Sequence, residues 1–96
     1  MKILIIEKDE LVFNILKRKL EEQGYEIVTE NDQYDLAIIE EKELGRVKNN
    51  IPIIMIFNSK QPIKVEKAKQ QGIKDFIFKT EFDIVEAVLK VKRLEK

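Results

Sequence analysis

The chain has 96 residues, which is enough for one domain with a small hydrophobic core. Its 18 basic and 18 acidic residues cancel, so no net charge draws the chain toward nucleic acid or an anionic membrane. Cysteine and histidine are both absent, which excludes disulfides, thiolate chemistry, and the commonest general base and metal ligand.

No apolar run in the sequence is as long as a membrane span, and there are no repeats or low-complexity segments. We therefore expect a single domain over residues 1–96, located in the cytoplasm.

The first quarter of the chain predicts a helix between two strands. Residues 2–6 are rich in isoleucine and leucine, as is typical of a strand. Asp9 is expected to cap a helix that runs to about Gln23 and buries one apolar stripe. Gly24 suits the left-handed position that follows a helix, and the alternating residues 25–29 predict a half-buried edge strand.

A third strand is expected at residues 35–40, where four apolar residues run without interruption and end on Glu40. Such a run is typical of a strand buried on both faces. Glu40 would stand at the carboxyl end of a central strand, the edge where open α/β sheets place their chemistry. Residues 41–48 then allow at most two helical turns, with Leu44 and Val47 facing inward.

The second half of the chain predicts two further strands, each followed by a helix. Residues 53–57 form the most apolar run and predict a central strand, and residues 75–78 predict the fifth strand. One helix is expected between Pro62 and Gly72. A last helix is expected with Thr80 as its N-cap, and Asp83 would complete a variant capping box.

The order of elements, β-α-β-β-α-β-α-β-α, predicts a three-layer α/β fold with a mostly parallel sheet. The link between the second and third strands is unusually short, because residues 30–34 reach only ~16 Å. Two solutions remain open. Either an extended segment replaces the usual crossover helix, or the two strands form an antiparallel hairpin about Asn31 and Asp32.

Five segments in this order together resemble a response-regulator receiver domain over almost the whole chain. The resemblance implies a flavodoxin-like fold with five strands in the order 2-1-3-4-5, a missing second helix and a shortened third. That sheet order favours the extended crossover. The segments are MKILIIEKDE at residues 1–10, the helix that ends at Gly24-Tyr25, YDLAIIE at 34–40, IPIIM at 51–55 and GIKDFIFK at 72–79.

The family transfers a phosphoryl group from a histidine kinase to an aspartate with the help of a divalent cation, and this chain departs from its pattern. Glu7 and Lys8 stand where the family has two acidic metal ligands, and Glu40 stands where it has the phosphoacceptor aspartate. Phe57 replaces a small hydroxyl residue at the end of the fourth strand. Lys79 matches the family's lysine after the fifth strand.

These departures predict a degenerate phosphoacceptor pocket. Because Lys8 stands in place of an acidic residue, the site has one carboxylate fewer and carries an ammonium group about where the metal would lie. A hard divalent cation needs several oxygen ligands. Lys8 and Lys79 could neutralise Glu7 and Glu40 without a metal. Glu40 is one methylene longer than aspartate, and phosphoryl transfer depends on positioning. We therefore expect no bound magnesium, no other cofactor and no enzymatic activity.

The leading hypothesis is a phosphorylation-independent pseudo-receiver that acts through a protein partner or a homodimer. The resemblance implies an interface through the family's fourth helix, fifth strand and fifth helix, with Phe76, Ile84, Val88 and Val91 as a possible partner face. The alternatives are core packing for these four residues, a switch that uses an atypical acidic acceptor, and a reduced scaffold without a partner. We expect no binding to nucleic acid by this domain alone and none to membranes.

Overall fold

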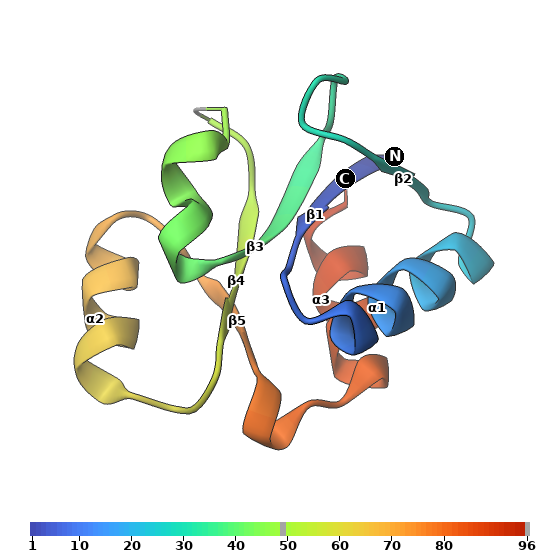
Figure 1. Cartoon of the computed structure of the whole chain (residues 1–96). Helices are drawn as coiled ribbons and strands as arrows, with labels where there is room; N and C mark the ends of the chain where they lie inside the picture. Colours follow the sequence, from blue (N-terminus) through green and yellow to red (C-terminus); the bar gives the residue numbers. More distant parts are fainter. Residues whose placement is uncertain (49, 96) are drawn as a thin grey trace.

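The computed structural model describes residues 1–48 and 50–95. They contain a five-stranded sheet with helices packed against it (Figure 1). Every strand pairing is parallel, and the strand order is β2-β1-β3-β4-β5. This is the flavodoxin-like order, so the predicted fold class is confirmed. The strands are β1 (Lys2–Ile6), β2 (Glu26–Val28), β3 (Leu36–Glu40), β4 (Ile53–Phe57) and β5 (Asp75–Phe78).

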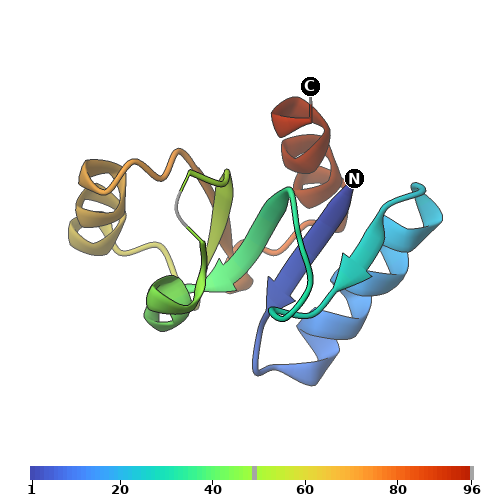
Figure 2. The same ribbon diagram turned by 90° about the horizontal axis from the view of Figure 1, so that it is seen from above.

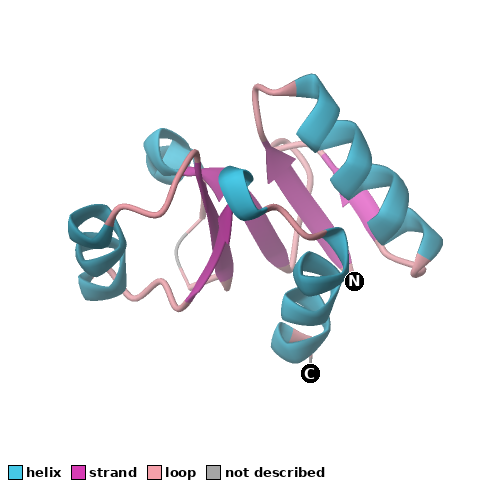
Figure 3. Cartoon of the chain, turned by 90° about the horizontal axis from the view of Figure 1, so that it is seen from below, coloured by secondary structure: helices cyan, strands magenta, loops and turns pink. Residues whose placement is uncertain are grey.

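Helices cover both faces of the sheet, as Figures 1, 2 and 3 show from three directions. Helices α1 (Glu10–Glu22) and α3 (Ile84–Leu94) pack on one face. The 3₁₀ helix η1 (Glu41–Arg46) and helix α2 (Pro62–Gln70) lie on the other. A short 3₁₀ helix, η2 (Lys79–Glu81), leads from β5 toward α3.

Side chains of the central strands alternate between these two layers. In β3, Leu36 and Ile38 belong to the core beneath α1 and α3, while Ala37 and Ile39 belong to the core on the side of η1. All four are fully buried. Because both faces of the strand are covered, its sequence is an unbroken apolar run rather than an alternating one.

The first helix begins as the sequence predicts, and the last one does not. The Asp9 carboxylate accepts hydrogen bonds from the backbone N–H groups of Leu11 and Val12 at the start of α1. Thr80 was expected to cap the last helix, but it lies within η2. Asp83 is the N-cap instead: Phe82 and Asp83 are extended after η2, and the Asp83 carboxylate accepts from the backbone N–H groups of Val85 and Glu86.

The two predicted helix-stop glycines both lie outside regular helix in the left-handed region. Gly24 has φ +92° and Gly72 has φ +94°, a conformation that strains any residue with a Cβ. Each glycine therefore turns the chain from a helix back toward the next strand, as expected.

The short link between β2 and β3 is an extended crossover, and the hairpin alternative is wrong. β2 and β3 each pair in parallel with β1, on opposite edges of that strand. Near the start of the link, the backbone N–H and hydroxyl of Thr29 both donate to the Asp32 carboxylate at 3.0 Å. At its end, Asp35 and Lys2 exchange two hydrogen bonds of 2.8 Å. These contacts fix both ends of the crossover without a helix.

Tyr34 covers the sheet where the crossover passes. Its side chain is buried against Leu4, Ala37 and Ile39. Its hydroxyl accepts a hydrogen bond of 3.0 Å from the backbone N–H of Lys48, whose ammonium lies 4.9 Å from the ring centroid. A right-handed crossover helix between β2 and β3 would cover this same face, so Tyr34 takes over part of that helix's packing role.

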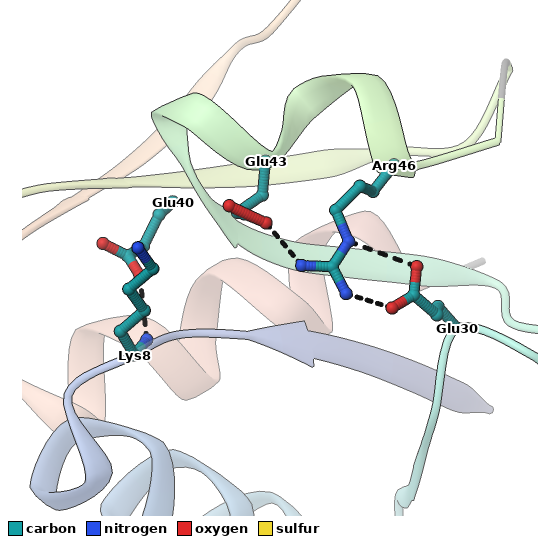
Figure 4. A network of polar contacts seen from close by, with 5 residues as sticks. All are labelled: Lys8, Glu30, Glu40, Glu43 and Arg46. Atoms are coloured by element: carbon teal, nitrogen blue, oxygen red, sulfur yellow. Dashed lines mark hydrogen bonds and ion pairs between the residues drawn. The ribbon is translucent and has the colours of Figure 1, made fainter.

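Arg46 fastens the crossover to η1 from outside (Figure 4). Its guanidinium donates to both oxygens of Glu30 in the crossover, and to Glu43 one turn away in η1. Hydrogen bonding from Arg46 lowers the pKa of Glu30, and the two carboxylates raise the pKa of Arg46. The network ties two segments that lie 16 residues apart in sequence.

We predict that Tyr34→Ala lowers the free energy of unfolding by about 3 kcal/mol, because it opens a cavity over the sheet. Tyr34→Phe should cost about 1 kcal/mol, since it removes only one hydrogen bond. Urea denaturation measures both values. Ile63→Ala on the exposed side of α2 is the control and should change stability little. Equal stability of Tyr34→Ala and the control would contradict the packing role.

We also predict that the Arg46 network stabilises the fold only above acidic pH. Because Arg46 lowers the folded-state pKa of Glu30 below its ordinary value of 4.5, its stabilising effect is present above that pH. It is lost as the pH falls through the lower folded-state pKa. Unfolding free energies of the native chain and Arg46→Met, measured against pH at low salt, should therefore converge in acid. A gap that stays constant would contradict the assignment.

Candidate functional site

The predicted site residues gather at the carboxyl edge of the sheet, because parallel strands end on the same side. Glu7 follows β1, Glu40 and Phe57 end β3 and β4, and Lys79 follows β5. The structure brings them together in two separate pairs and one aromatic cluster. Glu7 contacts Lys79, the backbone of Lys8 contacts Glu40, and Phe57 packs among other rings.

Glu7 and Lys79 form a buried ion pair. The Lys79 ammonium lies 2.8 Å from Oε2 of Glu7, and the side chains are 18 % and 0 % exposed. The backbone N–H of Asp9 donates to the same oxygen at 2.9 Å. Oε1 of Glu7 is buried without a hydrogen-bond partner among the described residues. The prediction that Lys79 could neutralise Glu7 is thus matched by the geometry.

Lys8 contacts Glu40 through its backbone rather than its side chain (Figure 4). The Lys8 N–H donates to Oε1 of Glu40 at 2.8 Å. The exposed Lys8 side chain lies near Lys42, whose ammonium lowers the pKa of Lys8, while Glu40 and Glu43 act in the opposite direction. Two ammonium groups, those of Lys8 and Lys42, therefore lie near Glu40, and the sequence pointed only to Lys8.

Phe57 is buried in a cluster of three aromatic rings. Its ring centroid lies 5.9 Å from that of Phe76 and 6.0 Å from that of Phe78, and the two β5 rings are 6.4 Å apart. Met55, Ala68 and Ile73 are buried in the same cluster beneath α2. Offset stacking of this kind adds to the energy of burial, so the end of β4 is filled by hydrocarbon.

A polar depression of about 210 Å³ lies beside Glu40, between the ends of β3 and β4 and the start of α2. Lys42, Asn58 and Lys64 are among the residues that line it. Lys64 forms an exposed ion pair of 3.4 Å with Glu41 across it. Within residues 1–48 and 50–95, no three carboxylates come together closely enough to hold a metal ion.

The predicted partner face is wrong, because three of its four residues belong to the core. Phe76, Val88 and Val91 are buried, and Ile84 is partly buried against the same core as Val88 and Val91. Helix α3 is rotated so that Val88 and Val91 point toward the sheet. Val85 and Leu89 of the same helix are exposed instead.

Two residues of the site were missed at the sequence level. Phe78 shares a face of β5 with Phe76, and the period-two alternation of a strand could have identified it. Lys42 follows Glu40 by two residues at the start of η1, and no pattern in the sequence pointed to it. Within the described residues, no helix is long and apolar enough to cross a membrane.

No family model and no curated protein matches this sequence. Among solved structures, HP1043, an orphan response regulator of H. pylori, aligns at 19 % identity over 100 % of this chain and 97 % of its own, with a TM-score of 0.84. The receiver domain of Francisella response regulator 1452 aligns at 21 % identity over 97 % and 94 %, with a TM-score of 0.81.

A third similar structure is an atypical orphan response regulator described with a phosphorylation-independent regulatory mechanism. It has 18 % identity over 98 % of this chain and 94 % of its own, with a TM-score of 0.82. At identities this low, the similarity shows the fold alone. The fold is that of response-regulator receiver domains, as the resemblance predicted, in a short version with fewer helices.

We predict that Lys79→Met lowers the free energy of unfolding by about 3 kcal/mol, because it leaves the buried Glu7 carboxylate without a counter-charge. Adding Glu7→Gln should recover most of that loss. Thermal and urea denaturation measure both. Lys64→Met is the matched control, since it breaks an exposed pair and should cost less than about 1 kcal/mol. Equal losses in Lys79→Met and Lys64→Met would refute a stabilising buried pair.

Proposed function

We propose that this chain is a phosphorylation-independent pseudo-receiver, a non-catalytic module that acts by binding protein in signal transduction. The observation that carries the proposal is the buried ion pair between Glu7 and Lys79. In the receiver family the acidic residues after the first strand hold a divalent cation. Here the chain's own ammonium group supplies the positive charge for that carboxylate.

The carboxylate oxygens of Glu7 and Glu40 do not form a suitable site for a divalent cation. Magnesium prefers six oxygen ligands in near-octahedral geometry. Glu7 offers only one unpartnered oxygen, and Oε1 of Glu40 already accepts the N–H of Lys8. The Lys8 and Lys42 ammonium groups beside Glu40 add repulsion toward a further cation.

The aromatic cluster supports the same proposal. Phe57 is 4 % exposed and stacks on Phe76 and Phe78. In the receiver family, a small hydroxyl residue at the end of the fourth strand moves toward the phosphoryl group during switching. Phe57 stands at that position and has no hydroxyl group. Because Phe57 and Phe76 are stacked, a movement of either ring would also lose that contact. Local geometry therefore favours one fixed state over a two-state switch.

The test is incubation with a small-molecule phosphodonor and Mg²⁺, followed by intact-mass spectrometry. We expect no stable adduct under conditions that fully modify a phosphorylatable receiver domain as a control. Mg²⁺ titration gives a second readout, because the amide N–H groups of Lys8 and Asp9 donate directly to Glu40 and Glu7. The NMR chemical shifts of these two amides should show no saturable change as Mg²⁺ is added. A stoichiometric adduct would instead support a switch that uses an atypical acceptor.

A further inference from the structure

A cavity of about 600 Å³ lies at the amino edge of the sheet, opposite to the edge that carries Glu7, Glu40 and Lys79. The segments that precede β4 and β5 line it, together with residues of η1 and the C-cap of α2. η1 and α2 share one face of the sheet (Figure 2). Ligand sites commonly have volumes of about 300–1,000 Å³, so the cavity can hold a small organic molecule.

The wall of the cavity is rich in isoleucine and leucine side chains. Ile73 is buried, and the others are partly exposed. They are Leu44 in η1, Ile51 before β4, Ile53 at the start of β4, Ile73 before β5 and Leu94 at the end of α3. A ligand with an apolar body would remove the exposed part of these side chains from water, which favours binding.

The two helices on this face leave the apolar wall incompletely covered. η1 has six residues, and its Leu44 is only partly buried. α2 has nine residues and packs on the core through Val65 and Ala68. Both helices are short, and the cavity remains at the end of the sheet between them.

The rim of the cavity favours a negatively charged group. Lys74 lies on it, is exposed, and forms no ion pair within residues 1–48 and 50–95. The side-chain amides of Asn50 and Gln71 line the same cavity and can donate hydrogen bonds to an oxygen of a ligand. One ammonium group and two amides together match a single carboxylate.

The other charged residues at the cavity already have partners. Lys48 holds its ammonium 4.9 Å from the ring centroid of Tyr34 and 3.5 Å from the carbonyl oxygen of Asp32. Asp75 is paired with Arg93, which balances its charge. A phosphate group carries about two charges at neutral pH and would need a second available cation. The charge balance therefore favours a monoanion such as a carboxylate.

We propose that this cavity binds a small carboxylate with an unbranched apolar chain, of the medium-chain fatty acid type. The chain lies along the isoleucine and leucine side chains of the wall, and the carboxylate accepts hydrogen bonds from Lys74 and from the amides at the rim. At the efficiency typical of small ligands, decanoate binds with a dissociation constant of about 0.1 mM. The site is separate from the carboxyl edge, so the proposal goes beyond the pseudo-receiver function and does not depend on it.

Titration of the full chain with sodium decanoate from about 0.01 to 2 mM, followed by two-dimensional NMR, tests the proposal. We expect saturable shifts of the amides of Ile51, Ile73 and Lys74, and no change at Lys8 and Asp9 on the opposite edge. Hexanoate should bind at least about tenfold more weakly, because it buries fewer CH₂ groups. Acetate, which has the carboxylate without the chain, should give no saturable shift.

A charge-reversal variant tests the role of the rim. Lys74→Glu should weaken decanoate binding about tenfold, because it places a carboxylate where the proposal needs an ammonium group. Lys60→Glu is the matched control, since it makes the same charge change on an exposed residue that does not line the cavity. It should leave the dissociation constant unchanged. Both lysines are exposed, so both variants should fold, and circular dichroism verifies this.

Shifts that do not saturate, or that appear equally at both edges of the sheet, would overturn the proposal. So would native affinity in Lys74→Glu, or acetate that binds as tightly as decanoate. Equal binding of decanol, which has the same chain and no charge, would show an apolar site without anion recognition and would also contradict it. None of these readouts measures phosphoryl transfer, so failure of this proposal and failure of the proposed function are distinguishable.

Discussion

The charge balance at the carboxyl edge of the sheet depends on one buried ion pair. Lys79 follows β5 and reaches Glu7 after β1, so the pair spans the edge above β3 and β4. A buried charge is costly without a partner, and each member of this pair supplies the counter-charge for the other. Lys79 therefore supplies the counter-charge for one oxygen of Glu7, the residue that directly follows β1.

The other residues at the carboxyl edge are also held by contacts within the chain. Glu40 is held by the backbone of Lys8, and the adjacent ammonium groups of Lys8 and Lys42 face the solvent around it. Phe57 fills the end of β4 with a ring that stacks on two neighbours. Each feature is ordinary packing or ion pairing by itself. Together they give each of the two carboxylates at this edge a partner from the chain itself.

The sheet keeps its order with a much reduced crossover. Two devices replace the missing helix: Tyr34 buries its ring over β1 and β3, and Arg46 joins the crossover to η1 through Glu30. At this end of the sheet a few side chains cover the strands in place of a whole helix, and Leu4, Ala37 and Ile39 remain buried beneath them. A small domain can accept this arrangement because its central strands remain buried on both faces.

The sequence was sufficient to predict the strands, because buried parallel strands give apolar runs. Turn residues and helix-cap residues mark the ends of these runs. It was insufficient for the rotation of α3. Val85 and Leu89 are as apolar as Val88 and Val91, and only the packed structure decides which pair faces the sheet. In the site, the sequence predicted that Lys8 and Lys79 could neutralise Glu7 and Glu40, but only the structure shows that Lys79 pairs with Glu7. The backbone contact from Lys8 could not be predicted, because side-chain identity carries no information on it.

The central claim is that Lys79, rather than a metal ion, balances the charge of Glu7. A crystal structure obtained in the presence of Mg²⁺ and a fluoride-based phosphoryl mimic tests it most directly. The account predicts the Lys79 ammonium within hydrogen-bonding distance of Glu7 and neither ligand beside Glu40. A magnesium ion on Glu7 together with the mimic bound at Glu40 would contradict it.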